Sequence, residues 1–212
     1  MSKIVAIGDI HGCLRPFERL LDKLPIDWKR DRLVLLGDYI DRGPEPRKVL
    51  DLVMELKETY GSRVIPLLGN HEWMFMRYLV GQDENFYLAN GGDTTLAQFM
   101  EEGFFFVPPE YPSFLKSLPY YWETEAYIFV HAGLRPKKPL DKQDLHDLLF
   151  IRSDFIHSKY DWGKRIIFGH TPFSEPLVEP NKIGIDTGCV YGGELTALIL
   201  PDMEFISEPC GR

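Results

Sequence analysis

Short apolar runs and helical repeats alternate through the first third of the chain. Ile4–Ile7 is rich in β-branched residues and predicts a buried strand, while apolar residues recur at helical spacing from Leu14 to Leu24. The predicted order is a strand at 4–7, a helix at 14–24, a strand at 33–36, a helix at 46–60 and a strand at 64–68. This order predicts a βαβαβ unit in which helices cover parallel strands.

The rest of the chain has a different pattern. Helices are expected at 72–80 and 94–100, and the aromatic, proline-rich stretch from Phe104 to Trp122 is interpreted as short helices that cap the core and form one wall of a cleft. Further apolar runs at 127–130, 165–168, 183–185 and 195–200 predict a second sheet with more antiparallel character. We therefore expect one α/β domain over residues 1–212, with a two-sheet β-sandwich core flanked by helices.

Composition narrows the class of protein. A length of 212 residues fits one domain, and 24 Lys and Arg against 32 Asp and Glu give a net charge of −8. This acidic balance argues against a nucleic-acid partner or a membrane surface. No apolar run is long enough to cross a bilayer, and the first residues do not form a signal peptide. Cys13, Cys189 and Cys210 are odd in number and widely spaced, so a reducing, cytoplasmic setting is expected rather than a disulfide framework.

Candidate chemistry lies where the predicted strands end. Five strands run into glycine and ligand-type residues, in the segments Gly8-Asp9-Ile10-His11, Gly37-Asp38, Gly69-Asn70-His71, His131-Ala132-Gly133 and Gly169-His170. A single Asp or His at a strand end is more often a turn former or a helix cap. Five such ends that hold four of the six histidines argue against independent structural causes. Because loops converge at the carboxyl ends of strands in α/β sheets, we expect a ligand site there.

The donor set at these ends predicts a metal centre. Its members are Asp9, His11, Asp38, Asn70, His131 and His170. Asp9 and His11 lie two apart in a segment expected to be extended, so both should point the same way. Carboxylate, amide and imidazole donors suit Mn²⁺, Fe²⁺ or Zn²⁺ and are too rich in nitrogen for a dedicated Ca²⁺ site. Six side chains fit two ions roughly 3.5–4 Å apart, with Asp38 as the bridging carboxylate.

The ordered blocks Asp-x-His-Gly, Gly-Asp-x-x-Asp-Arg-Gly, Gly-Asn-His-Glu, His-Ala-Gly and Gly-His-Thr resemble the phosphoprotein phosphatase type of metallophosphoesterase, and the short bacterial members most of all. The resemblance implies a calcineurin-like β-sandwich with two divalent metal ions, Mn²⁺ in vitro and Fe or Zn as other options. It assigns the first metal to Asp9, His11 and Asp38 and the second to Asp38, Asn70, His131 and His170. It also implies phosphate-binding arginines at Arg42 and Arg152 and a general acid, His71, oriented by Asp41. Asn70 and His71, adjacent on an expected extended segment, should face opposite ways.

The implied reaction is hydrolysis by a hydroxide that bridges the two metals, with no covalent enzyme intermediate. Asp41 precedes Arg42, as in protein phosphatases, whereas symmetrical diadenosine tetraphosphatases of the family usually have another residue there. This favours a serine/threonine protein phosphatase, with phosphotyrosine as a further substrate. The alternative is a hydrolase of dinucleoside polyphosphates such as diadenosine tetraphosphate. A non-catalytic phosphate-binding module is a third interpretation, which the complete residue set disfavours. The expected partner is a phosphoprotein or a small phosphorylated substrate, and the oligomeric state stays open.

Overall fold

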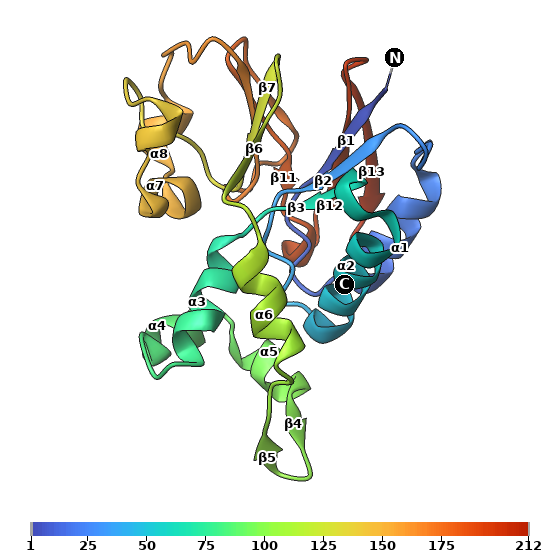
Figure 1. Cartoon of the computed structure of the whole chain (residues 1–212), viewed down its shortest axis with the longest axis vertical. Helices are drawn as coiled ribbons and strands as arrows, with labels where there is room; N and C mark the ends of the chain where they lie inside the picture. The colour runs from blue at the N-terminus through green and yellow to red at the C-terminus, as the bar shows by residue number, and fades with distance from the viewer. Residues whose placement is uncertain (1, 212) are drawn as a thin grey trace.

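Two β-sheets lie face to face in the computed structural model, which describes residues 2–211 (Figure 1). The strands of the first sheet, in spatial order, are β11 (Asp186–Thr187), β12 (Glu194–Leu200), β1 (Ile4–Ile7), β2 (Arg32–Leu35) and β3 (Val64–Pro66), and β13 (Glu204–Pro209) also pairs with β12. Those of the second sheet are β6 (Tyr121–Glu123), β7 (Tyr127–Val130), β8 (Arg165–Phe168), β10 (Lys182–Gly184) and β9 (Leu177–Val178).

Helices cover the outer faces of this sandwich and extend from one end of it (Figure 1). Helices α1 (Leu14–Lys23) and α2 (Pro46–Tyr60) lie against the first sheet, and α7 (Leu145–Phe150) and α8 (Ser153–Ile156) lie beside the second. The projecting end contains α3 (Asn70–Tyr78), α4 (Glu84–Ala89), α5 (Asp93–Gln98), the hairpin of β4 (Met100–Glu101) and β5 (Phe104–Phe105), and α6 (Glu110–Ser117). The described residues also contain three 3₁₀ turns: η1 (Gly61–Arg63), η2 (Leu140–Lys142) and η3 (Cys189–Tyr191).

Side chains that point alternately to the two faces of each strand form three apolar layers. In β1, Val5 and Ile7 pack under α1 and α2, while Ala6 faces the second sheet. In β7, Phe129 faces the first sheet, and Ile128 packs on the side of α7 and α8. Because successive side chains point to opposite faces of a strand, a strand buried on both sides has the continuous apolar sequence seen here.

The direction of the strands brings the polar loops together. The pairs β1/β2, β2/β3, β7/β8 and β8/β10 are all parallel. Within each sheet, therefore, the carboxyl ends of the central strands lie at the same edge, and the loops that follow them converge. The predicted α/β sandwich and the first βαβαβ unit are confirmed.

Several details of the predicted layout are wrong. The run at 195–200 forms β12, which belongs to the first sheet and pairs antiparallel with β1. The centre of the second sheet is parallel, because β7, β8 and β10 are joined by crossover segments. The stretch from Phe104 to Trp122 contains an exposed hairpin strand, one helix and strand β6 rather than a set of short helices.

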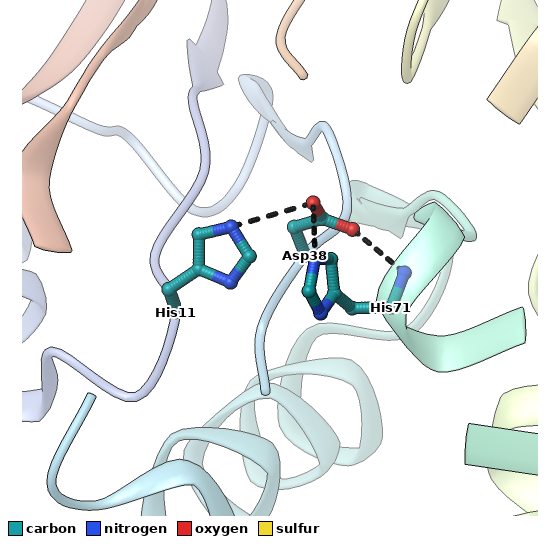
Figure 2. A group of neighbouring side chains, drawn as sticks. All are labelled: His11, Asp38 and His71. Atoms are coloured by element: carbon teal, nitrogen blue, oxygen red, sulfur yellow. Dashed lines mark hydrogen bonds and ion pairs between the residues drawn. The ribbon is translucent and has the colours of Figure 1, made fainter. Parts of the chain in front are cut away.

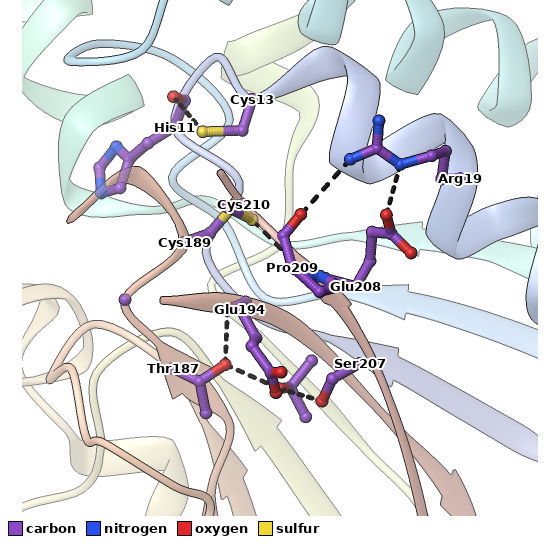
Figure 3. The surroundings of a disulfide bond; sticks show 12 residues. His11, Cys13, Arg19, Thr187, Cys189, Glu194, Ser207, Glu208, Pro209 and Cys210 are labelled. Atoms are coloured by element: carbon purple, nitrogen blue, oxygen red, sulfur yellow. Dashed lines mark hydrogen bonds and ion pairs between the residues drawn. A yellow bond between two sulfur atoms is a disulfide. The ribbon is translucent and has the colours of Figure 1, made fainter. Parts of the chain in front are cut away.

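The expectation about cysteines is also wrong. Cys189 in η3 and Cys210 after β13 form a disulfide, with their Cα atoms 5.1 Å apart (Figure 3). The pairing of β12 with β13 brings these positions together, which their separation of 21 residues did not suggest. Cys13 is buried with a free thiol. No helix within residues 2–211 is long and apolar enough to cross a membrane, and a cytoplasmic location stays a prediction.

Candidate active site

Asp38 stands at the centre of the converging loops. Its carboxylate belongs to two clusters of potential ligand atoms. The first also contains His11 and His71, and the second also contains His131 and His170. Within the first cluster, Asp38 Oδ2 lies 3.4 Å from His11 Nε2 and 3.9 Å from His71 Nε2 (Figure 2). Within the second, Asp38 Oδ1 lies 3.4 Å from His131 Nε2. A carboxylate common to both clusters is the position expected of a bridging ligand.

The imidazoles are oriented to offer lone pairs. His11 Nδ1 donates a hydrogen bond to the Ile40 carbonyl and His131 Nδ1 donates one to the Leu36 carbonyl, each over 2.8 Å. Both Nε2 atoms are then unprotonated. Burial lowers the pKa of His131 and His170 and, together with His71, lowers that of His11 to about 3, so these imidazoles are neutral at neutral pH.

Orphaned acceptors show that a cation fits between these side chains. His131 Nε2 lies 2.8 Å from Asn70 Oδ1, although both atoms are hydrogen-bond acceptors. His170 Nε2 is buried and finds no hydrogen-bond partner in the described part of the chain. Acceptors crowded together away from water are costly unless a positive charge satisfies them. A borderline divalent ion, which imidazole nitrogen and carboxylate or amide oxygen can ligate together, meets this need.

Buried carboxylates in the same region also indicate a cation site. Asp9 is buried, and both of its carboxylate oxygens accept the backbone N–H of His170. Burial, followed by the charges of Asp186 and Asp38, raises the pKa of Asp9. Burial and the Asp38 charge raise the pKa of Asp186 to about 6. Three acidic groups in such a small volume favour cations, which would reverse the direction of these pKa shifts.

Glu72 fixes the loop that carries Asp38. Its buried carboxylate accepts backbone N–H bonds from Asp38 (2.9 Å), Tyr39 (2.8 Å), Ile40 (3.3 Å) and Gly69 (3.0 Å). Burial and the Asp38 charge raise the pKa of Glu72 to about 8, whereas these donors favour the ionised form. A Cβ on Gly69 would lie 2.3 Å from the Asp38 nitrogen, so only glycine permits this close approach. Asp38 therefore depends on Glu72 for its position.

Site residues adopt backbone conformations that non-glycine residues rarely occupy. The φ angles are +45° at His11, +53° at Asp38, +70° at Asp41, +66° at Arg42 and +63° at His170. Each such residue costs free energy that the surrounding contacts must supply, and such strain is concentrated at functional sites. The expectation of an extended Asp9–His11 segment is wrong at His11, whose φ is +45°.

A hydrogen-bonded chain orients His71. His71 Nδ1 lies 2.6 Å from Asp41 Oδ2, and Asp41 Oδ1 accepts the hydroxyls of Tyr87 (2.7 Å) and Thr95 (2.5 Å). His71 Nε2 is buried and has no hydrogen-bond partner among residues 2–211, and His71 lines the small cavity that Arg42 and Arg152 also line. Asn70 and His71 are the first two residues of α3 rather than part of an extended segment, so they diverge by helical rotation.

The two predicted arginines share a cavity with several of the predicted metal ligands. Arg42 and Arg152 line a cavity of about 120 Å³ together with Asp38, Asn70, His71, His170, Phe86, Asn90 and Phe150. Arg42 Nη1 lies 2.7 Å from His11 Nε2. A metal ion bound at His11 Nε2 would replace this contact and free the guanidinium group. A cavity of this size, lined by two guanidinium groups that can each donate paired hydrogen bonds, suits one phosphoryl group.

The structure therefore brings the predicted residues together, with two differences. Asp9 is in neither ligand cluster among residues 2–211, where His71 joins His11 and Asp38 instead. Asp9 as a ligand stays a prediction. Sequence reasoning gave no role to Glu72, Tyr87, Thr95 or Asp186. Of these, Asp186 had a usable signal, because it follows β10 in the same way as the other strand-end residues.

Comparison with known proteins places the chain among enzymes that cleave phosphate esters. A sequence model described as calcineurin-like phosphoesterase matches residues 2–203. The bis(5′-nucleosyl)-tetraphosphatase PrpE [asymmetrical] of Anoxybacillus flavithermus is 31% identical over 230 residues, covering 96% of this chain and 92% of its own. That of Geobacillus thermodenitrificans is 32% identical over 235 residues, with the same coverage.

Solved structures agree with these relatives. A crystal structure proposed to be of a diadenosine tetraphosphatase superposes with a TM-score of 0.77 and 27% identity, covering 100% of this chain and 94% of the other. A serine/threonine phosphatase from Saccharomyces cerevisiae gives a TM-score of 0.68 at 17% identity, covering 100% of this chain and 80% of the other, and shows likeness of fold alone.

We predict that Glu72→Gln weakens the metal centre through the Asp38 loop. The amide offers one acceptor oxygen, and its NH₂ group would face backbone donors, so buried N–H groups lose their partners. The free energy of unfolding should fall by roughly 3 kcal/mol, and manganese bound per chain after dialysis should fall with it. Chemical denaturation and elemental analysis measure both. Glu58→Gln, on the exposed face of α2, should change neither. Full metal content in Glu72→Gln would contradict this role.

Proposed function

The chain belongs to the calcineurin-like phosphoesterases, and from this premise we propose that it is an asymmetrical bis(5′-nucleosyl)-tetraphosphatase. In diadenosine tetraphosphate, water would add to the phosphorus of one terminal nucleotide and the P–O bond to the adjoining phosphate would break. The products are then AMP and ATP. The observation that carries the proposal is 31–32% identity to tetraphosphatases across almost the whole of both chains.

The protein phosphatase favoured by the sequence motifs has less support. Its structural neighbours are under 20% identical and share the fold, and a fold alone does not determine the substrate. The Asp41-Arg42 argument contrasts protein phosphatases with symmetrical tetraphosphatases, whereas the relatives carry the asymmetrical name. That argument therefore does not weigh against the activity proposed here.

We assign the metal ligands as the strand ends indicate. Asp9, His11 and Asp38 would hold one divalent ion, and Asp38, Asn70, His131 and His170 a second, with Mn²⁺, Fe²⁺ or Zn²⁺ suited to the donors. When bound, such a pair supplies a nucleophile from water at neutral pH and offsets phosphate charge.

The chain's own residues bind the phosphate and assist departure of the leaving group. Arg42 and Arg152 would hold the non-bridging oxygens of the attacked phosphate through their forked guanidinium groups. Asp41, held by Tyr87 and Thr95, accepts the hydrogen bond from His71 Nδ1. His71 Nε2 is then the atom from which a proton passes to the departing oxygen.

A substrate panel in Mn²⁺ tests the proposed function. Diadenosine tetraphosphate should be hydrolysed to equal amounts of AMP and ATP, with kcat/KM at least about 100-fold above that for phosphoserine and phosphothreonine peptides, as expected of a site that discriminates by dedicated contacts. Chromatography separates these products from ADP. Asp38→Asn should abolish turnover of every substrate. Two ADP as products, or a preference for phosphopeptides, would refute the proposal.

His71→Asn should affect substrates according to their leaving group. An alkoxide from phosphoserine needs a proton, so its hydrolysis should fall about 10²–10⁴-fold. A phosphate leaving group, as in the tetraphosphate, is a much weaker base and needs the proton less. The fold decrease in the rate of tetraphosphate hydrolysis should therefore be at most about one tenth of that for phosphoserine. Steady-state kinetics on both substrates measures the ratio. Equal losses would argue against proton donation by His71 and favour the ligand role that its closeness to His11 and Asp38 allows.

A further inference from the structure

We propose that a second, larger cavity on the far side of Arg42 binds the nucleoside attached to the attacked phosphate. The proposal rests on the proposed function in taking a nucleotide as the ligand. It adds a location and a set of contacts for the part of the substrate that undergoes no chemistry.

Arg42 joins the two cavities. It lines both the small cavity over Asp38 and His170 and a cavity of about 600 Å³ between the start of α1, the loop before α2 and η3. On one side its guanidinium bonds His11 Nε2, and on the other it lies over the ring of Tyr191, 5.6 Å from the ring centre. A phosphate held by Arg42 would therefore have the metal ligands on one side and Tyr191 on the other.

The volumes of the two cavities indicate which part of a nucleotide each can hold. The small cavity, at about 120 Å³, is too small for a nucleoside. The larger one, at about 600 Å³, falls within the 300–1,000 Å³ typical of small-molecule sites. A nucleotide whose phosphate occupies the first cavity can place its base and ribose in the second.

The walls of the larger cavity have the chemistry that a nucleoside needs. Tyr191 is 59% exposed and offers a ring face on which a base can stack. Leu14 and Pro16 at the start of α1 provide apolar surface on the cavity wall. Glu45, whose carboxylate is bonded to Lys48 over 2.7 Å, can accept a hydrogen bond from a ribose hydroxyl.

The stacking surface is held in place before any ligand arrives. Tyr191 ends η3, its backbone N–H donates to the Gly188 carbonyl over 2.9 Å, and Cys189 in the same turn is bonded to Cys210 (Figure 3). Both cysteines line the cavity. A wall fixed in this way lowers the entropy cost of binding.

A second pair of aromatic side chains offers an alternative stacking surface. Phe86, 51% exposed on α4, and Phe150 at the end of α7 line the small cavity. A base stacked there would have to lie outside the small cavity, whose volume is about 120 Å³. The volumes favour Tyr191, and the experiment compares both positions.

The test compares two ligands that differ by the nucleoside alone. One is the phosphonate analogue of AMP, in which a methylene replaces the 5′ bridging oxygen and prevents hydrolysis. The other is methylphosphonate. Calorimetry on the manganese-loaded protein gives the ratio of their dissociation constants, and any change transmitted through Arg42 affects both ligands and cancels.

We expect the AMP analogue to bind at least about 10-fold more tightly than methylphosphonate, and Tyr191→Ala to reduce this advantage by roughly 10-fold. Tyr191→Phe keeps the ring and should keep the advantage. Phe86→Ala should keep it also, as should Tyr160→Ala, an exposed tyrosine outside both cavities.

Equal binding of the two ligands, or an advantage that Tyr191→Ala leaves intact, would overturn the inference. Loss of the advantage in Phe86→Ala alone would overturn it too and place the base beside α4. Failure of the proposed function is distinct. A protein that does not cleave diadenosine tetraphosphate but shows the Tyr191-dependent advantage retains the nucleoside site, whereas a tetraphosphatase without the advantage retains the function.

Discussion

The whole site depends on holding one carboxylate, that of Asp38, between two sets of imidazoles where its backbone is strained. The residue adopts φ of +53°, and its loop has no regular structure of its own. Glu72 supplies the constraint by accepting the N–H groups of Asp38, Tyr39 and Ile40. Because Glu72 lies in the first turn of α3, the strand that ends before Asp38 and the helix that carries His71 are locked to each other. The position of Asp38 relative to Asn70 and His71 therefore depends on a buried side chain that need not touch substrate or metal.

Much of the fold follows from local patterns. Strands β1 to β3, helices α1 and α2 and the position of the ligand loops could be predicted because each strand is buried on both faces and each helix has one apolar face. Local patterns do not show which sheet a strand joins. Strand β12 joins the first sheet because it pairs with β1, from which it is separated by almost 200 residues of sequence. Strand β13 pairs with β12 instead, and this second pairing brings Cys189 and Cys210 together. The register between β1 and β12 has no local signature and could not be predicted, and the disulfide was missed because it depends on how η3 and the end of β13 meet in space.

The candidate site shows the same division. Residue types at strand ends predicted the cluster, because convergence needs only parallel strands and short loops. The directions of side chains could not be predicted, since five residues adopt positive φ and Asn70 and His71 begin a helix. Glu72 was missed because its partners are backbone groups, which a sequence does not display. The motifs left the substrate open for a related reason: they describe the phosphoryl site, whereas the specificity proposed here rests on surfaces beyond Arg42.

Whether Asp38 joins two metal ions can be read from the electron paramagnetic resonance spectrum of the manganese-loaded protein together with its metal content. A bridging Asp38 predicts two Mn²⁺ per chain, with the exchange-coupled spectrum of ions that share a ligand. Asp38→Ala should remove the coupling. One ion per chain, or two ions with the spectrum of isolated Mn²⁺, would show that Asp38 does not bridge two metals.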